Sequence, residues 1–86
     1  MGTKTAMDTG YRIDPGGTVR SPQGKTPWWV RSDKGSEVIW SRAGDTRWRL
    51  VGGRFVDPTG RETGYYVTSM GDGRAIHGPE AGLPWD

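Results

Sequence analysis

Turn-forming residues recur along this chain at intervals that are typical of short antiparallel strands. The signals are Asp33-Lys34-Gly35, Ala43-Gly44-Asp45, Gly52-Gly53, Asp57-Pro58-Thr59-Gly60 and Asp72-Gly73. Their spacing of about 8–14 residues leaves room for one strand between successive turns. No segment places apolar residues at i, i+3, i+4 and i+7 without an intervening Gly or Pro, so helices are not expected. We therefore predict an all-β fold.

Aliphatic residues are scarce, so aromatic rings must supply much of the core. Leu, Ile, Val and Phe together account for 12 of the 86 residues, whereas Gly and Pro contribute 15 and 6. Five Trp and three Tyr offset this shortage, since each large ring buries roughly 150–250 Å². We predict a small antiparallel meander of five or six strands, curled into an SH3-like barrel or a partly open sheet, with an extended N-terminal arm.

Three choices of turn predict which residues share a face of the sheet. A three-residue loop at 33–35 would set Val30 opposite Val38, and one at 43–45 would set Val38 opposite Leu50. A two-residue turn at Gly52-Gly53 would pair Leu50 with Phe55. The predicted buried face contains Trp28, Val30, Val38, Trp40, Trp48, Leu50 and Phe55. Because side chains alternate, the outer face would carry Trp29, Arg31, Glu37, Ile39, Arg47, Arg49, Val51 and Val56, with Arg31 opposite Glu37.

The composition divides the chain into three parts. Residues 1–27 contain no Trp and are rich in Gly, Pro, Thr and Ser, residues 28–77 hold the β-meander domain, and residues 78–86 form an irregular tail. Within the first part, a turn at 14–17 predicts one hairpin, which must dock on the domain or on a partner to be stable. No internal repeat is convincing, because turn chemistry explains the two Asp-Pro-x-Gly segments.

The outer face is the most suggestive candidate site, with Trp29, Arg31, Ile39, Arg47 and Arg49 on neighbouring strands. Arginines beside an aromatic ring suit a nucleic-acid backbone with stacked bases, and they also suit a protein partner. The third interpretation is an ordinary solvated face, in which the arginine stems cover Trp29. Trp85 and Tyr11 are candidate anchors for a partner, and the alternative for Trp85 is that it folds back to cap the barrel.

The residue types argue against an enzyme. The chain has no Cys and a single histidine, His77. Thiolate chemistry is therefore excluded, and acid–base catalysis would need partners that the sequence does not place beside His77. The scattered carboxylates show no metal-ligand spacing, and the paired glycines open no helix that would cradle a phosphate. We predict no catalytic residues, no metal and no cofactor.

These observations favour a non-enzymatic protein–protein interaction or assembly module. We expect a small accessory or structural subunit, for example of a virion-like assembly, that holds a protein partner or further copies of itself with its arm and outer face. A nucleic-acid-binding barrel is the alternative, although a net charge of +2 is low for that role. No run of about 18 apolar residues is present, and residues 1–27 lack an apolar signal segment. We therefore expect no membrane contact, and a location in the cytoplasm or within a larger assembly.

Overall fold

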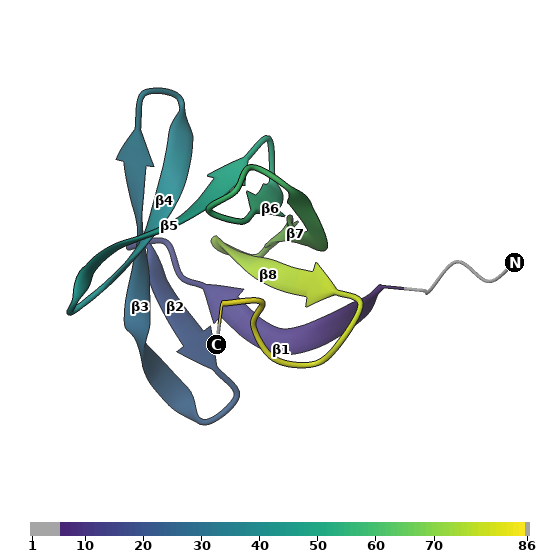
Figure 1. Cartoon of the computed structure of the whole chain (residues 1–86). Helices are drawn as coiled ribbons and strands as arrows, with labels where there is room; N and C mark the ends of the chain where they lie inside the picture. The colour runs from purple at the N-terminus through teal and green to yellow at the C-terminus, as the bar shows by residue number, and fades with distance from the viewer. Residues whose placement is uncertain (1–5, 86) are drawn as a thin grey trace, which may run out of the picture.

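The chain folds into a closed barrel of eight antiparallel strands (Figure 1). The computed structural model describes residues 6–85. Its strands are β1 (Met7–Ile13), β2 (Thr18–Ser21), β3 (Gly24–Asp33), β4 (Ser36–Ser41), β5 (Gly44–Val51), β6 (Arg54–Val56), β7 (Glu62–Met70) and β8 (Gly73–Gly78). Each strand pairs with the next one in the chain, and β8 pairs back with β1. The predicted all-β meander is confirmed, and the predicted number of strands is too small.

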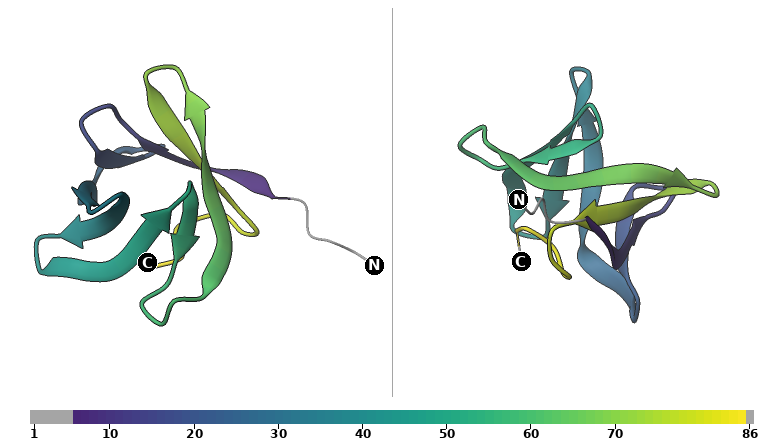
Figure 2. Two further views of the ribbon diagram at one scale, coloured as in Figure 1. Left: turned by 90° about the horizontal axis from the view of Figure 1, so that it is seen from above. Right: turned by 90° about the vertical axis from the view of Figure 1, so that its right-hand side faces the viewer.

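The N-terminal residues supply the additional strands. The predicted hairpin is confirmed, because Ile13 of β1 lies opposite Val19 of β2 across the turn at 14–17. This hairpin is part of the barrel, since β2 pairs with β3 and β1 pairs with β8 (Figure 2). Ile13 and Val19 are both 0% exposed, so the core is incomplete without them. The predicted N-terminal arm is therefore not a separate segment, because the described residues of this region, 6–27, contribute β1, β2 and the start of β3 to the barrel.

A pattern of threonine, any residue, aromatic, any residue, aliphatic recurs in the four odd-numbered strands. Its copies are 9–13, 26–30, 46–50 and 63–67, so the expectation of no internal repeat is wrong. In every copy the threonine hydroxyl donates a hydrogen bond of 2.7–2.9 Å to a carbonyl of a neighbouring even-numbered strand. The same hydroxyl accepts a bond of 3.2–3.3 Å from the backbone amide of the aromatic residue. The acceptor carbonyls belong to Ile76, Val19, Ile39 and Phe55.

Each copy of the pattern forms a bulge in its strand. On β5, Asp45 lies opposite Trp40 while Arg49 lies opposite Val38, so the stretch of β5 between these pairs is longer than that of β4. The other three copies show the same offset. The residue after the threonine has a positive φ in three copies, at Gly10 (86°), Arg47 (68°) and Gly64 (87°). Bulges bend and twist a strand, and these provide the curvature that closes so small a barrel.

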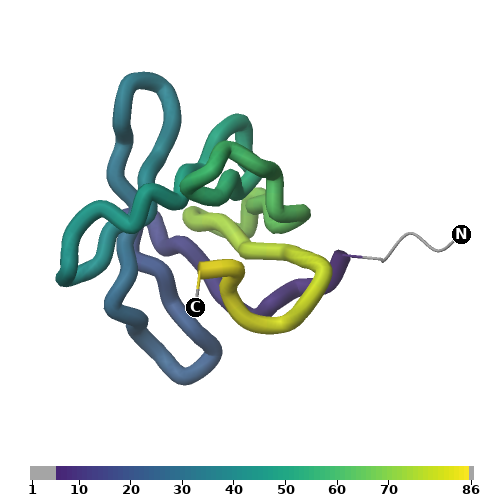
Figure 3. Tube along the Cα trace, viewed as in Figure 1, coloured from purple at the N-terminus to yellow at the C-terminus, as the bar shows by residue number. Residues whose placement is uncertain are grey.

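The core fills the inside of the barrel with alternate residues from the strands and with one residue from the tail. Its buried members are Ile13, Val19, Val30, Ile39, Leu50, Phe55, Tyr65, Ile76 and Leu83. Tyr65 is the aromatic residue of one copy of the threonine pattern. The aromatic residues of the other three copies, Tyr11, Trp28 and Trp48, are partly buried against this cluster. The tail turns back after β8 and ends near the barrel (Figure 3), so that Leu83 and Trp85 join the core from outside the sheet.

The turn between β3 and β4 is one residue shorter than predicted, and this reverses the faces of β4. Lys34 adopts a left-handed φ of 49° and Gly35 one of 89°, so these two residues form the turn and Asp33 pairs with Ser36. A one-residue change in register exchanges the two faces of a strand. Ile39, predicted outside, is therefore in the core, while Trp40, predicted in the core, faces outward.

Of the two later turns, the first differs from its prediction and the second agrees with it. Between β4 and β5 the turn again has two residues, Arg42 and Ala43, because Ser41 pairs with Gly44. Together with the bulge in β5, this turn places Val38 opposite Arg49 and not opposite Leu50. The prediction for Gly52-Gly53 is confirmed, since Leu50 lies opposite Phe55.

An ion pair joins two strands that are not neighbours in the barrel. Arg74 of β8 donates two hydrogen bonds to the Glu37 carboxylate of β4, at 2.6 and 3.0 Å. This hydrogen bonding raises the pKa of Arg74 above its ordinary value. Both side chains are about one-third exposed, and both lie at the end of the barrel that holds the turns 34–35 and 71–72. The predicted pairing of Glu37 with Arg31 is wrong, and Glu37 instead closes this end of the barrel.

Candidate functional site

Two tryptophans lie side by side on the outside of the barrel. Trp29 of β3 is directly opposite Trp40 of β4, and the adjacent pair, Val30 and Ile39, belongs to the core. Because side chains alternate along a strand, both indoles face outward, and both are partly exposed. Opposed side chains on one face of an antiparallel pair come into contact. The two indoles therefore present aromatic surface on the same outer face of the β3–β4 pair.

Arginines complete this surface. The guanidinium carbon of Arg31 lies 4.7 Å from the centre of the Trp40 ring, which is the geometry of a cation–π contact. Val38 lies between Arg31 and Arg49 in the strand pairing. It is only 2% exposed although it is absent from the interior cluster. We call Trp29, Arg31, Trp40 and Arg49 the tryptophan–arginine face.

A surface pocket of about 230 Å³ adjoins the tryptophan–arginine face. It is lined by Arg31, Ser32, Asp33, Val38, Trp40 and Asp45. The Arg49 guanidinium reaches Asp33 at 3.4 Å, and both side chains are almost half exposed. Exposed pairs of this kind contribute about 0–1 kcal/mol, so Arg49 can exchange Asp33 for a carboxylate of a partner at little cost. The face thus combines aromatic side chains with an arginine whose ion pair is weak.

The predicted site residues fall into three groups. Trp29, Arg31 and Arg49 lie together on the outer face as the sequence predicted. Arg47 lies in the β5 bulge, where its backbone amide donates to the Asp45 carboxylate at 2.6 Å. Ile39 is a core residue with 0% exposure, and the short turn at 34–35 is the reason. Sequence reasoning missed Trp40, which a two-residue turn at Lys34-Gly35 would have placed beside Trp29.

The two candidate anchors are both engaged by the barrel. Trp85 packs against Trp28 with ring centres 5.8 Å apart and against Phe55 at 5.5 Å, which agrees with the capping alternative. Tyr11 is the aromatic residue of the first bulge and is partly buried against the core. Neither ring is free to act as an exposed anchor in this conformation.

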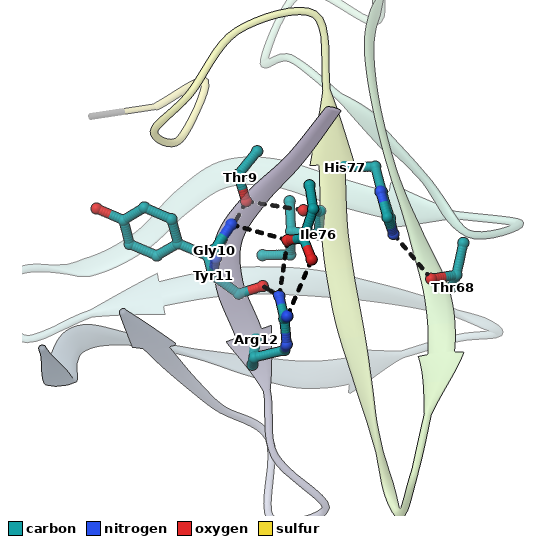
Figure 4. A network of polar contacts seen from close by, with 8 residues as sticks. Thr9, Gly10, Tyr11, Arg12, Thr68, Ile76 and His77 are labelled. Carbon is teal, nitrogen blue, oxygen red and sulfur yellow. Dashed lines mark hydrogen bonds and ion pairs between the residues drawn. The ribbon is translucent and has the colours of Figure 1, made fainter. Parts of the chain in front are cut away.

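The ring of His77 contacts two side chains of β7, and Figure 4 shows the contact with Thr68. Its ring stacks on Tyr66 with centres 5.4 Å apart, and Nε2 shares a hydrogen bond of 3.0 Å with the Thr68 hydroxyl. On the neighbouring strand β1, the Asp8 carboxylate accepts from both terminal nitrogens of Arg12, at 2.8 and 2.9 Å. Among residues 6–85, no three His, Asp or Glu side chains gather closely enough to hold a metal ion.

The Asp8 carboxyl supplies a test of the β1 bulge. Its hydrogen bond from Arg12, together with one from the Gly10 amide, lowers its pKa from 3.8 to about 2. Because the pKa is lower in the folded state than in the unfolded chain, the ionised Asp8 carboxylate stabilises the fold at pH values above about 3.8. This stabilisation is lost as the pH falls from about 3.8 to about 2. In an NMR titration we expect Arg12→Gln to raise the Asp8 midpoint towards 3.8. An unchanged midpoint would contradict the pairing of Arg12 with Asp8.

Comparison with known proteins adds no relative: no protein-family model, no curated protein and no solved structure matches this chain. In the part of the chain that the structure describes, no helix has the length and apolar character needed to cross a membrane.

Proposed function

We propose that this protein is a non-enzymatic protein–protein interaction or assembly module, and that its contact surface is the tryptophan–arginine face. The observation that carries this proposal is the position of Trp29 and Trp40, which lie opposite one another outside a barrel whose interior is already filled. Isolated apolar residues on a surface need no explanation. Two adjacent tryptophans with a stacked arginine resemble the Trp- and Arg-rich centres of protein interfaces.

Charge and rigidity indicate the kind of partner. Asp33 and Asp45 lie among the arginines of this region, so its positive charge is modest, in line with a net charge of +2 for the chain. Val38 is buried and Arg31 packs on the Trp40 ring, and contacts that restrict side chains before binding lower its entropic cost. These features suit a protein surface with an apolar centre and a few carboxylates at its rim, such as a neighbouring subunit of a larger, virion-like assembly.

A single-stranded nucleic acid is the second candidate, because adjacent indoles can stack bases while Arg31, Arg47 and Arg49 neutralise phosphates. Each phosphate contact contributes about 0.7 to the slope of log affinity against log salt for a single strand. Three contacts would give a slope near −2. Micromolar binding to oligonucleotides with that slope, lost on Trp29→Ala, would replace the protein partner by a nucleic acid.

The test uses substitutions on this face and a matched substitution on another part of the barrel. Tyr66 and His77 form a comparable outward aromatic pair on β7 and β8. Nuclease-treated wild-type protein, Trp29→Ala/Trp40→Ala and Tyr66→Ala would be compared by affinity purification from the native source and by binding measurements with the recovered partner. We expect the first variant to bind at least about 30-fold more weakly, which corresponds to 2 kcal/mol, and Tyr66→Ala to bind like the wild type.

The opposite pattern would contradict the proposal. If both folded variants bind the recovered protein equally well, the tryptophan–arginine face is not the contact surface. Circular dichroism spectra of the variants check that the barrel remains folded. Deletion of residues 1–27, which would have removed a separate arm, is unsuitable here because it removes β1 and β2.

A further inference from the structure

The C-terminal tail closes one end of the barrel with two side chains. Leu83 is 6% exposed and belongs to the core cluster. Trp85 meets three rings, with centre-to-centre distances of 5.8 Å to Trp28, 6.2 Å to Trp48 and 5.5 Å to Phe55. These rings come from β3, β5 and β6, and Trp28 and Trp48 are the aromatic residues of two bulges, so the tail binds at the end of the barrel that holds the bulges. The backbone of the tail turns back towards the barrel after β8 (Figures 1 and 3).

Polar contacts contribute little to this attachment. Within residues 6–85, no backbone–backbone hydrogen bond ties residues 79–85 to the barrel. The Tyr65 hydroxyl donates to the Glu80 carbonyl at a long distance of 3.5 Å. The indole nitrogen of Trp85 is buried without an acceptor, and an unsatisfied buried donor weakens an interaction. The tail is therefore held like a docked peptide, through apolar side chains, and not like a ninth strand.

The chain leaves the barrel at a fixed point, and a short connection leads from there to the docked side chains. Gly78 lies against the Tyr65 ring so closely that a Cβ would collide with it, and Pro79 lies beside Gly64. Gly82 has a φ of 92° and no neighbouring atom within contact distance of the position where a Cβ would be. Residues 79–82 thus form a short connection between a rigid strand end and the docked residues Leu83 and Trp85.

We propose that this end of the barrel is a peptide-binding site for the sequence Leu-Pro-Trp, and that its ligand in trans is the tail of a second copy of this chain. The same contacts form whichever copy supplies the tail, so the two arrangements differ mainly in effective concentration. A chain's own tail has the advantage at low protein concentration. High local concentration in an assembly, or a shorter connection, favours exchange between copies. This site is separate from the tryptophan–arginine face and does not depend on its function.

The first test supplies the tail as a peptide to a full-length chain with a weakened tail. The protein is Leu83→Ala/Trp85→Ala, and the probe is a labelled peptide of residues 79–86, with a Trp85→Ala peptide as the matched control. We expect saturable one-to-one binding that is at least about tenfold tighter than binding of the same peptide to wild-type protein, whose own tail competes. The control peptide should bind at least about tenfold more weakly, because it lacks the ring that meets Trp28 and Phe55.

Thermal melts keep this test decisive if the double variant is unstable. A ligand that binds only the folded state raises the melting temperature, so the wild-type peptide should stabilise or refold the variant and the control peptide should not. Equal effects of the two peptides, or no effect of either, would overturn the peptide site. A failure of the tryptophan–arginine face would leave these results unchanged.

The second test asks whether copies exchange tails. Deletion of residues 80–82 in the full-length chain leaves Pro79 as the single residue between Gly78 and Leu83, and we expect this connection to be too short for Leu83 and Trp85 to dock on their own barrel end. We expect light scattering after size-exclusion chromatography to show twice the monomer mass, and the additional substitution Trp85→Ala to restore the monomer. A folded monomer in the deletion variant would overturn exchange between copies.

Discussion

Phe55→Ala is expected to destabilise the barrel by about 3–5 kcal/mol, the usual cost of deleting a buried phenylalanine. Phe55 is 0% exposed and contacts Trp85 with ring centres 5.5 Å apart, so the substitution leaves a cavity between the sheet and the tail. Domains are stable by only about 0.05–0.15 kcal/mol per residue, or about 4–13 kcal/mol for a chain of this length, so the substitution should remove a large share of the total stability. Urea denaturation followed by circular dichroism and by tryptophan fluorescence measures the loss.

Trp40→Ala is the matched control for this prediction. It removes a larger ring, and the sequence-derived register would make it the more damaging change. In the structure Trp40 lies on the outer face with Arg31 stacked over it, so we expect a loss of only about 1 kcal/mol. A larger loss for Trp40→Ala than for Phe55→Ala would show that β4 has the register first predicted from the sequence.

The contrast between these two residues shows what the sequence could predict. Alternation and turn spacing were sufficient for the fold class, for the hairpin in residues 11–20 and for the Gly52-Gly53 register, because these depend on local chemistry. The faces of β4 depended on whether Lys34 accepts a left-handed φ, which it does at 49°. Asn, Asp or Gly would have signalled such a turn, whereas lysine does not. One residue was enough to exchange Ile39 and Trp40.

The closure of the barrel was beyond local reasoning for a different reason. Ile13 and Val19 look like part of an isolated hairpin because β8, the strand that pairs with β1 and closes the barrel, is supplied by the far end of the chain. The candidate site was predicted only in part, because its residues on β4 depend on the turn at 34–35. Trp29 and Arg31 share a face whatever turn follows β3, and Trp40 joins them only in the observed register.

The fourfold threonine pattern is present in the sequence, but it was not among the predicted features. Thr9, Thr26, Thr46 and Thr63 each precede an aromatic residue by two positions and an aliphatic one by four. The spacing between copies is irregular because the intervening turns differ in length. The hydroxyl contacts explain why threonine suits these positions: it is β-branched and favours a strand, and its oxygen can bond both a carbonyl and an amide.

Replacing all four of these threonines by valine should therefore unfold the protein, although valine has almost the same shape. Each hydroxyl makes one bond of 2.7–2.9 Å to a carbonyl and accepts one of 3.2–3.3 Å from an amide. Loss of both should cost about 1–2 kcal/mol per site. The sites lie on different strands, so their effects should add to about 4–8 kcal/mol.

The single variants make this prediction quantitative. Thr9→Val, Thr26→Val, Thr46→Val and Thr63→Val should lower the free energy of unfolding by similar amounts in urea titrations. Thr68→Val is the control, because its hydroxyl is exposed, lies outside the bulges and bonds only the His77 ring, so its effect should stay within about 0.5 kcal/mol. If one bulge variant is as stable as this control, the hydroxyl at that site does not hold the bulge, and the backbone, through Gly10, Arg47 or Gly64, sets its geometry alone.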